Sequence, residues 1–488
     1  MSMYIGIDLG TSGVKTVLTN EAGAIVHSVS RPLSVSMPHP LWSEQDPNDW
    51  WQATCDCLDE LSDKNSLSTV KAIGLSGQMH GATLLDSKGN VLRPAILWND
   101  GRSTNECEEL TRLVPDSSIR TGNLIMAGFT APKIVWVRKN EPEIFSKIDK
   151  VLLPKDFLRY QLTGEFGSDM SDAAGTVWLN TESRSWDEEL LKACGLSVDN
   201  MPSLYEGSSI TGHLKDSLQA RWGMQDVIIA GGAGDNAAGA IGCGIYEPGH
   251  AMLSLGTSGV YFAVTDRFTV NTAQAVHSFC HAIPNRWHMM SVMLSAASCL
   301  DWYAKQSGYA EVGSMIDDVQ KNTSHHDTQT PVFLPYLTGE RTPHNNPSAK
   351  AAFFGVSAST ERVHMARAVI EGVSMALADG IDAVHQSGVT AKSISLIGGG
   401  ARSTFWRQLL SDISGYELEY REGGDVGPAL GAARLAQLAA NPDADLSDIC
   451  FKPKLEATYT PNKKIHDNYL NKRQKFRELY YAVETFYS

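Results

Sequence analysis

Two identical turns in this chain carry residue types that suit phosphate oxygens. The string Leu-Gly-Thr-Ser-Gly-Val occurs at residues 9–14 and again at 255–260, each time between two apolar runs. Glycine, threonine and serine in such a turn present backbone N–H groups and hydroxyls in a concave arrangement that favours anions. Two such turns facing each other would hold a polyphosphate between two domains.

Asp8 stands just before the first turn, at the end of a strand that is otherwise apolar. An uncompensated carboxylate is costly to bury there, which favours a role beside a phosphate-bound Mg²⁺. The alternative is an Asx turn in which Asp8 caps its own loop, but the Gly-Thr-Ser that follows favours the metal. The turn is not a P-loop, because the spacing from Gly10 to Lys15 is wrong for that motif. Lys15 is within reach of a β- or γ-phosphate, although a solvated strand lysine fits the pattern equally well.

A second acid, Asp235, follows the buried-looking strand 227–230 at the start of a helix. Residues 232–237 match the loose dinucleotide-binding fingerprint, which makes a nicotinamide oxidoreductase an alternative. That motif requires an acidic residue at the end of a strand about 20 residues further on, and no convincing candidate stands there. Asp235 is instead placed to accept the proton of a substrate hydroxyl during attack on phosphorus. An ordinary helix N-cap is the competing interpretation, and the two phosphate turns favour the base.

Polar side chains follow the strand that begins at Val70, where the same cleft should open. Gln78 and His80 are placed to bind sugar hydroxyls, although a single histidine beside a methionine is often structural. Residues 98–102 (Trp-Asn-Asp-Gly-Arg) fit either a turn with a cap or a carbohydrate contact, and the sequence leaves both open. The polar loop His-His-Asp at 325–327 is expected to lie in water rather than on a metal.

The elements that position these residues are strands and helices that alternate in two halves. With 488 residues and a duplicated unit half a chain apart, the chain is long enough for two related domains. Asp46-Pro47 predicts the start of a helix. Residues 361–385 predict a long amphipathic helix, and residues 465–487 a charged closing helix. A turn at 246–249 divides the chain into one domain over residues 1–245 and another over residues 246–488.

Composition narrows the classes of partner. The net charge of −14, without a compensating basic run, argues against nucleic acid. No apolar stretch of the sequence is long enough to span a membrane. The N-terminus enters a strand at once, which leaves no room for a signal peptide. The eight cysteines are scattered, so free thiols in a cytoplasmic protein are expected.

These features together resemble a known family. The turns at 8–12 and 256–258, with the glycine turn at 398–401, are similar to the phosphate and adenosine motifs of the superfamily that contains hexokinase, actin and the large chaperone ATPases. Within it, residues 128–136 (Gly-Phe-Thr-Ala-Pro-Lys-Ile-Val-Trp) and 351–371 resemble the two signatures of the FGGY carbohydrate kinases. The resemblance covers nearly the whole chain. The strings at 78–81, 98–102, 234–239 and 339–347 are most similar to the members that act on xylulose.

The resemblance implies two ribonuclease-H-like α/β domains with a catalytic cleft between them, the sugar lying mostly against the first and ATP against the second. It implies ATP-dependent phosphorylation of D-xylulose to D-xylulose 5-phosphate, with Mg²⁺ as cofactor and Asp235 as the general base. Asp8 is carried over as the second catalytic residue and as the metal ligand. The implied sugar ligands are Met79, His80, Asp235 and Asn236. The implied ATP ligands are Thr11, Ser12, Lys15, Gly256, Thr257, Gly399, Gly400 and Ala401.

Alternatives remain within and beyond this family. Another FGGY kinase activity, on ribulose, fuculose or gluconate, is the nearest, because residue types do not settle which sugar geometry fits. Glycerol kinases of the family have an Arg-Glu pair where this chain has Met79-His80, which argues against glycerol. An ATPase of the same fold that needs no sugar is a more distant alternative. The family also suggests a homodimer.

Overall fold

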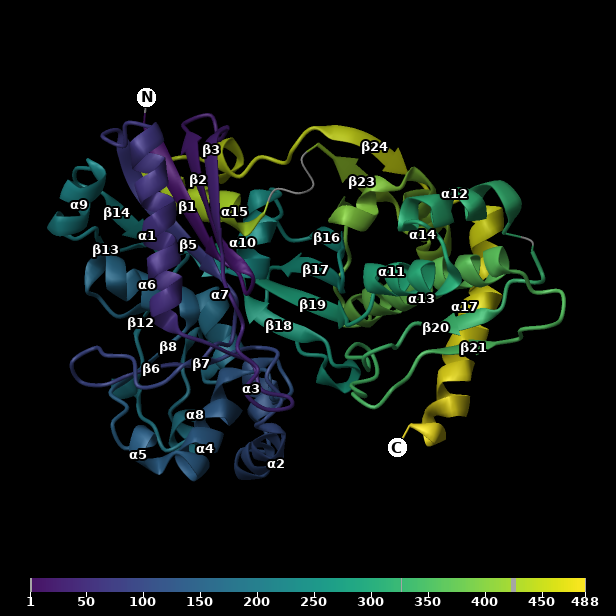
Figure 1. Cartoon of the computed structure of the whole chain (residues 1–488), viewed down its shortest axis with the longest axis horizontal. Helices are drawn as coiled ribbons and strands as arrows, with labels where there is room; N and C mark the ends of the chain where they lie inside the picture. The colour runs from purple at the N-terminus through teal and green to yellow at the C-terminus, as the bar shows by residue number, and fades with distance from the viewer. Residues whose placement is uncertain (1, 326, 423–426, 488) are drawn as a thin grey trace.

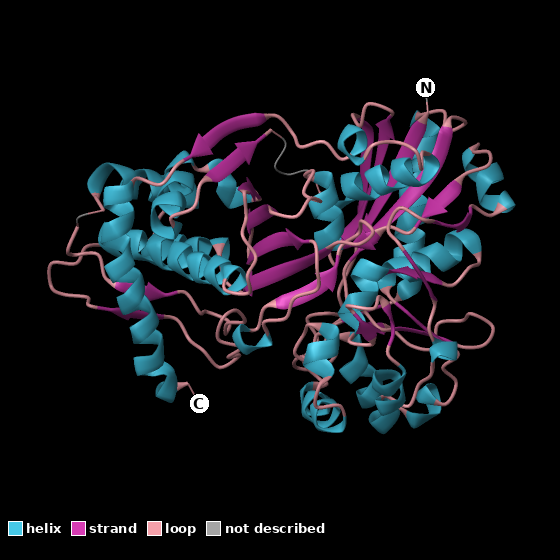
Figure 2. Ribbon diagram, turned by 180° about the vertical axis from the view of Figure 1, so that it is seen from behind, coloured by secondary structure: helices cyan, strands magenta, loops and turns pink. Residues whose placement is uncertain are grey.

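The computed structural model describes residues 2–325, 327–422 and 427–487. The chain forms two halves, each built round a seven-stranded sheet (Figure 1). Seen from behind, helices flank both sheets (Figure 2). The N-terminus lies at an edge of the first half, and the last long helix stands on the second half (Figure 1). The structure therefore confirms the predicted α/β class with two units.

The first sheet is organised round the hairpin that contains the first Gly-Thr-Ser turn. Its order is β13 (Ile210–His213), β14 (Ile228–Ala230), β5 (Val70–Gly77), β1 (Met3–Leu9), β2 (Gly13–Asn20) and β3 (Ile25–Pro32), with β15 (Ala233–Gly234) also paired to β5. β1 is parallel to β5 and antiparallel to β2. Parallel strands end at the same edge of a sheet, so Asp8 and Ser76 lie in register there.

The second sheet repeats this arrangement round the second turn. Its order is β18 (His277–Cys280), β19 (Trp287–Met293), β17 (Gly259–Thr265), β16 (His250–Leu255), β22 (Ser393–Ile397), β23 (Leu418–Arg421) and β24 (Leu455–Tyr459). From β19 to β24 the strand directions match those from β3 to β13 in the first sheet. β18 is an additional edge strand beside β19. The duplicated string thus marks a duplicated sheet.

The first half contains short elements besides its sheet. Its helices are α1 (Pro47–Lys64), α2 (Thr104–Leu113), α3 (Ser117–Thr121), α4 (Thr130–Asn140), α5 (Pro142–Phe145), α6 (Pro154–Thr163), α7 (Met170–Ala173), α8 (Glu188–Ala193), α9 (Asp216–Trp222) and α10 (Asp235–Gly242), with 3₁₀ turns Ala174–Thr176 and Val198–Asn200. Its short strands are β4 (Glu44–Gln45), β6 (Thr83–Leu85), β7 (Ala95–Ile96), β8 (Lys150–Leu152), β9 (Gly167–Asp169), β10 (Leu179–Asn180), β11 (Ser185–Trp186) and β12 (Ser203–Tyr205). Helix α1 begins as predicted, with the Asp46 carboxylate accepting from the backbone N–H of Asn48.

The second half is rich in long helices. They are α11 (Ala297–Ser307), α12 (Val312–Asn322), α13 (Arg362–His385), α14 (Thr404–Ser414), α15 (Pro428–Ala440), α16 (Leu446–Ile449) and α17 (Lys463–Val483), beside strands β20 (Val332–Leu334) and β21 (Ala352–Phe354) and 3₁₀ turns Thr272–Gln274, Gly399–Arg402 and Glu484–Phe486. Helix α13 lies where predicted, but it is buried nearly all round rather than amphipathic, because α11, α12 and α14 cover it. Within the described ranges, no helix combines the length and the apolar content that crossing a bilayer requires.

Helix α15 comes late in the chain but packs on the first sheet, where Figure 1 shows it beside α10. A Cβ atom on Gly6 of β1 would lie 1.9 Å from the Ala429 carbonyl oxygen, and one on Gly74 of β5 would lie 1.9 Å from that of Ala432. Glycine is therefore needed at both strand positions for this close approach. The contact ties the strands that carry the first turn to residues of the second half.

Candidate active site

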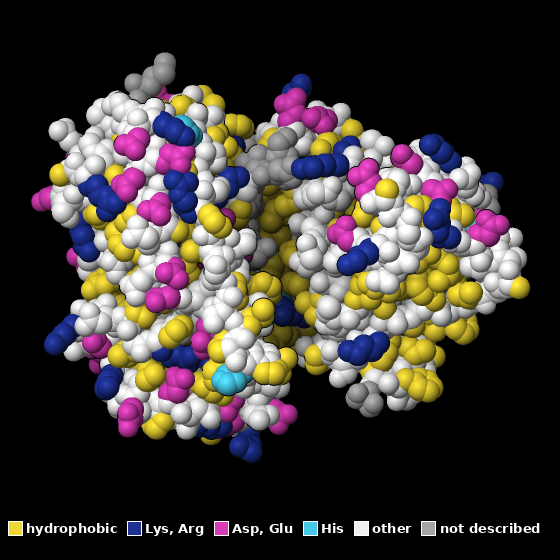
Figure 3. All heavy atoms as spheres, viewed as in Figure 1, with side chains coloured by type: hydrophobic (Ala, Val, Ile, Leu, Met, Phe, Trp, Pro, Cys, Tyr) yellow, Lys and Arg dark blue, Asp and Glu magenta, His cyan; other side chains and the backbone are white. Residues whose placement is uncertain are grey.

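Figure 3 shows a hollow between the two halves of the molecule. The carboxyl groups of Asp8 and Asp235 are neighbours, since the charge of Asp235 acts on the pKa of Asp8. Asp8 is the last residue but one of β1, and Asp235 begins α10 directly after β15. Both strands pair with β5. Burial raises the pKa of Asp8 to about 7, and the charge of Asp235 contributes to the rise, whereas a hydrogen bond from the Ser76 hydroxyl (3.0 Å) opposes it. Burial likewise raises the pKa of Asp235 to about 6. Two acids with raised pKa values in one cleft are typical of a catalytic or cation-binding site.

Asp235 is the first residue of α10, and Gly234 is its N-cap. One carboxylate oxygen, Oδ1, accepts from the Asn236 backbone N–H (2.7 Å) and side-chain Nδ2 (3.0 Å). The other oxygen has no hydrogen-bond partner among the residues that the structure describes. The helix start fixes the carboxylate while leaving one oxygen available, which is what a base needs.

The first Gly-Thr-Ser turn is bound closely to the first half of the chain. The Thr11 hydroxyl donates to Gln78 Oε1 (2.9 Å) and accepts from Trp98 Nε1 (2.9 Å). The Thr11 carbonyl accepts from Gln45 Nε2 (2.7 Å). Ser12 is exposed at the tip of the turn, and Lys15 lies opposite Asp8 in the β1–β2 register. Ser12 and Lys15 therefore have side chains that can reach a phosphate, whereas the Thr11 hydroxyl is already engaged.

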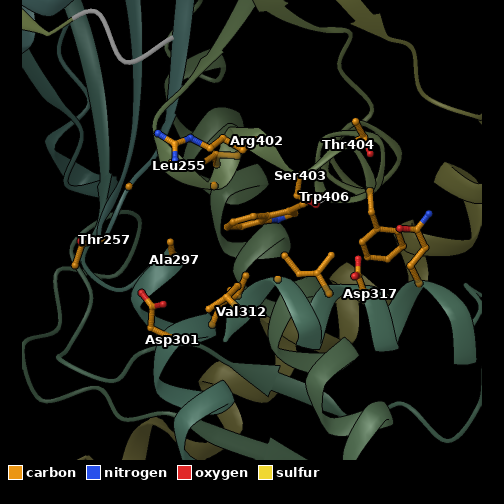
Figure 4. A pocket seen from close by; sticks show the side chains of 18 residues that line it. Leu255, Thr257, Ala297, Asp301, Val312, Asp317, Arg402, Ser403, Thr404 and Trp406 are labelled. Atoms are coloured by element: carbon orange, nitrogen blue, oxygen red, sulfur yellow. Dashed lines mark hydrogen bonds between the residues drawn. The ribbon is translucent and has the colours of Figure 1, made fainter. Parts of the chain in front are cut away.

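The second turn lines a cavity of about 730 Å³ in the second half, shown in Figure 4. Of the predicted ATP ligands, this cavity brings together Gly256, Thr257, Gly399 and Gly400. Further lining residues include Asp301, Val312, Asp317, Arg402 and Trp406. Ala401 is fully buried beside this cavity and does not line it. The Ala401 carbonyl accepts a hydrogen bond from Arg407 Nε, so this residue shapes the turn from beneath.

The predicted sugar ligand His80 has a constrained conformation. Its backbone φ is +69°, a left-handed value that costs free energy for a residue with a Cβ atom. The His80 carbonyl accepts from Lys133 Nζ (2.8 Å) and Thr130 Oγ1 (3.1 Å). Its Nδ1 lies 2.6 Å from the Gly175 carbonyl, so Nδ1 carries the proton and Nε2 is an acceptor. Burial lowers the pKa of His80 to about 3, and the ring is neutral.

Met79 follows the end of β5, beside the strand β15 that leads into Asp235. It is buried, and a Cβ atom added to Gly234 would meet its Cγ at 3.0 Å. Met79 therefore packs directly beneath the residue that precedes Asp235. The four predicted sugar ligands thus follow two paired strand ends, because Met79 and His80 come after β5 and Asp235 and Asn236 come after β15.

Residues 98–102, for which the sequence left two interpretations open, fall into two groups in the structure. Asp100 is buried, where it accepts from the Ser43 backbone N–H (2.6 Å) and from Arg102 Nη2 (2.7 Å). The Arg102 guanidinium lies 3.6 Å from the centre of the Trp42 ring. These two residues form a turn, in which the Arg102 backbone N–H donates to Asp100 Oδ1 (2.9 Å), and they do not cap α2, whose N-cap is Ser103. Trp98, by contrast, is 47% exposed beside the first Gly-Thr-Ser turn. In the polar loop, Asp327 lies 3.2 Å from His364 Nε2, and His326 lies outside the described residues.

Comparison with known proteins agrees with this geometry. Residues 3–242 match the N-terminal domain of the FGGY family of carbohydrate kinases, and residues 251–440 match its C-terminal domain. The chain belongs to the FGGY family of carbohydrate kinases. The sequence resemblance is thereby confirmed.

Several full-length relatives of this FGGY kinase are similar throughout. It is 59% identical to the xylulose kinase of Escherichia coli K12 over 98% of both chains. It is 54% identical to the xylulose kinase of Klebsiella pneumoniae over 100% of both chains. A crystal structure of a "xyloylose kinase" from Brucella ovis superposes with a TM-score of 0.95 at 46% identity, covering 99% of this chain and 100% of that one. A gluconate kinase from Lactobacillus acidophilus superposes with a TM-score of 0.94 at 26% identity, covering 100% and 99%.

Sequence reasoning missed a buried ionic cluster that supports the catalytic side of this kinase. The Lys155 ammonium lies within 3.1 Å of carboxylates of Asp156, Asp169 and Asp172, all fully buried. Arg159 donates to the carbonyl oxygens that end β14, at Ala230 (2.8 Å) and Gly231. These contacts hold the segment that leads into Asp235. The residues stand in ordinary helix and strand positions, so no local signal distinguished them from surface charges.

A second missed feature is a chain of amides behind the first turn. Gln78 Nε2 donates to Gln45 Oε1 (3.0 Å), which also accepts from Trp50 Nε1 (3.0 Å). The same two glutamines hold both polar groups of Thr11. Gln78, predicted as a sugar-side residue, is fully engaged in this network. A hydrogen-bonded network thus joins the first Gly-Thr-Ser turn to Gln78, in the segment that precedes His80.

Proposed function

We propose that this FGGY kinase transfers the γ-phosphoryl group of ATP to the C5 hydroxyl of D-xylulose, which gives D-xylulose 5-phosphate. The observation that supports the proposal is the neighbouring pair Asp8 and Asp235, carried by strands that both pair with β5, together with a cavity in the second half of a size that suits a nucleotide. The substrate is inferred from the xylulose kinases that the chain resembles over its full length.

Asp235 acts as the general base in this proposal. Its free carboxylate oxygen accepts the proton of the C5 hydroxyl while the hydroxyl oxygen attacks phosphorus. The hydrogen bonds from Asn236 keep the carboxylate in one orientation. Met79, His80 and Asn236 position the sugar, with His80 Nε2 accepting from a sugar hydroxyl. Closure of the cleft on the sugar would exclude water, which otherwise competes as the acceptor.

Asp8 is the residue proposed to hold Mg²⁺. Its raised pKa fits this role, because a dication beside two buried carboxyl groups offsets their mutual repulsion. No cluster of three His, Cys, Asp or Glu residues suited to a metal exists in the part of the chain that the structure describes. One or two carboxylates suffice for Mg²⁺, which keeps several waters and takes substrate phosphates as ligands. When bound with ATP, the ion supplies charge neutralisation at the β- and γ-phosphates.

ATP is proposed to bind across the two halves. Gly256, Thr257, Gly399 and Gly400 line the cavity, with Ala401 supporting the glycine turn. Ser12 and Lys15 of the first turn would contact the phosphates from the opposite side, with Thr11 contributing its backbone. Phosphoryl transfer depends mainly on positioning and charge stabilisation, which two opposed turns provide.

A coupled ADP-release assay over a panel of acceptors tests this proposal. We expect turnover with D-xylulose to exceed that with D-ribulose, L-fuculose, D-gluconate and glycerol. Gluconate belongs in the panel because a gluconate kinase shares the fold. Faster turnover with another acceptor would reassign the substrate, and ATP hydrolysis at the same rate without any sugar would replace the kinase by an ATPase. Absence of NAD binding excludes the oxidoreductase.

We also propose a cytoplasmic location and a homodimer. All eight cysteines are free thiols, and seven of them are buried, as expected in a reducing compartment. The homodimer rests on the family resemblance, and light scattering of the purified protein tests it.

A further inference from the structure

Arg341 lies in a loop of the second half that is anchored at the end of β19. The Glu340 carboxylate accepts from the backbone N–H groups of Leu294 (3.0 Å) and Arg341 (2.7 Å). The Thr342 hydroxyl donates to the Ala275 carbonyl (3.0 Å). These bonds fix the backbone on both sides of Arg341, which restricts where its side chain can point. Residues 339–347 were noted in the sequence, but neither the proposed chemistry nor the ATP cavity uses Arg341.

A relay of hydrogen bonds orients the Arg341 guanidinium. Arg341 Nη1 lies 3.3 Å from His277 Nε2, and His277 Nδ1 lies 2.8 Å from Asn123 Oδ1. Asn123 Nδ2 donates to the carbonyls of Thr121 (2.9 Å) and Ser278 (2.8 Å). The guanidinium only donates, so His277 Nε2 accepts and Nδ1 carries the ring proton. Asn123 belongs to the first half and His277 to β18, so the relay spans both halves.

The same relay places Arg341 beside the sugar side of the cleft. Phe129 makes edge contacts with both histidines, its ring centre lying 4.6 Å from that of His80 and 5.7 Å from that of His277. The charge of Arg341 contributes to the lowered pKa of both His80 and His277. The pKa of Asp235, by contrast, is set by burial and by the hydrogen bonds of Asn236. The charge of Arg341 therefore acts on the His80 end of the site and not on the proposed base Asp235.

The Arg341 guanidinium has unused donors. Beyond His277, its side chain has no hydrogen-bond acceptor among the residues that the structure describes, and burial lowers its pKa. The Arg341 side chain is half-buried, and the charge of the adjacent Glu340 balances part of its own, while the neutral His277 ring is its only hydrogen-bond acceptor in the described part of the chain. Its planar fork of N–H groups suits two adjacent oxygen acceptors. A bound molecule with neighbouring oxygens at this position would complete the pairing.

We propose that Arg341 binds the sugar at the end remote from the phosphorylated hydroxyl, where it donates hydrogen bonds to the hydroxyl and carbonyl oxygens. The inference rests on the proposed function for the identity of the sugar. It means that the second half, through Arg341, completes a sugar site that the sequence assigned mainly to the first half. Sugar binding then draws the two halves together, because its two ends are held by different halves.

The test compares Arg341→Met and Arg341→Lys with the control Arg286→Met. Arg286 lies between β18 and β19, and its side chain bonds only the carbonyl of the adjacent Asn285 among the described residues. For Arg341→Met we expect kcat/KM for D-xylulose to fall about 10- to 100-fold, the range for loss of a charge-assisted hydrogen bond. Arg341→Lys should fall less, because it keeps the charge but not the fork. The KM for ATP should stay within about twofold in all three variants, and Arg286→Met should match the wild type, since neither ATP nor the sugar loses a charge-assisted contact.

A truncated sugar separates binding from general disruption. Glycerol resembles only the reacting end of the ketose, so its inhibition constant should not change in Arg341→Met. Weakened D-xylulose kinetics with unchanged glycerol inhibition supports the proposal. If D-xylulose kinetics and glycerol inhibition weaken equally, or if the KM values for the sugar and for ATP rise together, Arg341 has a structural role and the proposal is wrong. A loss confined to kcat or to ATP overturns it in favour of a phosphate contact.

Failure of this proposal is distinguishable from failure of the proposed function. If the wild type phosphorylates D-xylulose and Arg341→Met does so equally well, the Arg341 assignment is wrong while the kinase activity stands. If the wild type prefers another sugar, the substrate is wrong, and the same variants measured with that sugar decide the role of Arg341. Melting temperatures show whether each variant is folded.

Discussion

The two Gly-Thr-Ser hairpins share six consecutive residues but differ in the residues that flank them. Asp8 precedes the first turn by two positions, and Ser254 holds the equivalent place before the second. Lys15 follows the first turn, whereas its counterpart Tyr261 is buried and bonds to His385 (2.7 Å). The shared string specifies the hairpin turn, and the flanking residues decide that only the first copy carries charges. The first turn is suited to chemistry and the second to holding a ligand.

The segments after the neighbouring parallel strands differ in the same way. β5 runs into the side chains Gln78, Met79 and His80, whereas β22 runs into glycines at 398–400. A Cβ atom on Gly399 would meet nothing within 4 Å, so bare backbone faces the cavity there. One sheet edge thus ends in side chains and the other in bare backbone, which agrees with the proposal that the first binds the sugar and the second the nucleotide.

The largest expected effect concerns Asp235, which lies outside both copies of the duplicated string. Asp235→Asn keeps the size of the side chain but removes the base, so kcat should fall about 10²- to 10⁴-fold. ATP affinity should stay close to that of the wild type, since the nucleotide cavity is untouched. Turnover in the ADP-release assay and ATP binding by calorimetry check both. Retained turnover would remove Asp235 from its role.

Single substitutions at the equivalent positions 8 and 254 should show that only the first hairpin contributes to turnover and to the Mg²⁺ requirement. Asp8→Asn should lower turnover and raise the Mg²⁺ concentration required, whereas Ser254→Ala should do neither. An unchanged metal titration in Asp8→Asn would return Asp8 to a turn-capping role.

Although Asp8→Asn should lower turnover, it should raise the stability of the folded protein. The pKa of Asp8 rises from 3.8 to about 7 on folding, so the folded protein binds the proton more tightly. The free energy of unfolding therefore decreases as pH rises between these values, and the penalty is complete above pH 7. Asp8→Asn removes it, so its melting temperature should exceed that of the wild type by more at pH 8 than at pH 5. An equal difference at both pH values would contradict the buried-acid interpretation.

The pH dependence of turnover reports on the acid pair. A base must be deprotonated, so kcat/KM should rise with pH through the pKa of Asp235, about 6. In Asp235→Asn the limb due to Asp235 should be lost, and an acid limb that remains reports on Asp8, which must also be deprotonated to hold Mg²⁺. A limb near pH 4 in the wild type would show that burial does not raise the pKa as described.

Substitutions at the two strand-end segments should affect different substrates. His80→Ala should raise the KM for the sugar more than that for ATP, because it removes the Nε2 acceptor. Gly400→Ala should do the reverse, since its Cβ would lie 2.5 Å from Trp406 Cζ3 in the wall of the cavity. Steady-state kinetics with each substrate varied in turn measures this, and equal effects on both KM values would indicate misfolding.

The smallest expected effect distinguishes the two threonines. Thr11→Val removes a hydroxyl that binds Gln78 and Trp98. The loss should loosen the segment that leads from Gln78 to His80, so the KM for the sugar should rise by about twofold to tenfold, as expected for one neutral hydrogen bond. Thr257→Val removes a hydroxyl beside the cavity and should change the KM for ATP instead. If both variants affected ATP alone, the Thr11 network would have no functional role.

The sequence by itself determined the duplicated sheet, the two turns, the acids at 8 and 235, and the family. These features depend on residues close together in the chain, because turn chemistry and strand alternation are local properties. The start of α1 at Pro47 and the position of α13 followed from the same local signals.

Only the tertiary structure decided which of these groups are available and what surrounds them. It engaged the Thr11 hydroxyl with Gln78 and Trp98 and buried Ala401. It also brought Arg341 against His277, whose ring shares the Phe129 contact with His80 of the other half. It also placed α15 on the first sheet, through glycines that have no evident purpose in the sequence. Such contacts join residues hundreds of positions apart, and their free energy depends on burial and mutual geometry that no local pattern encodes.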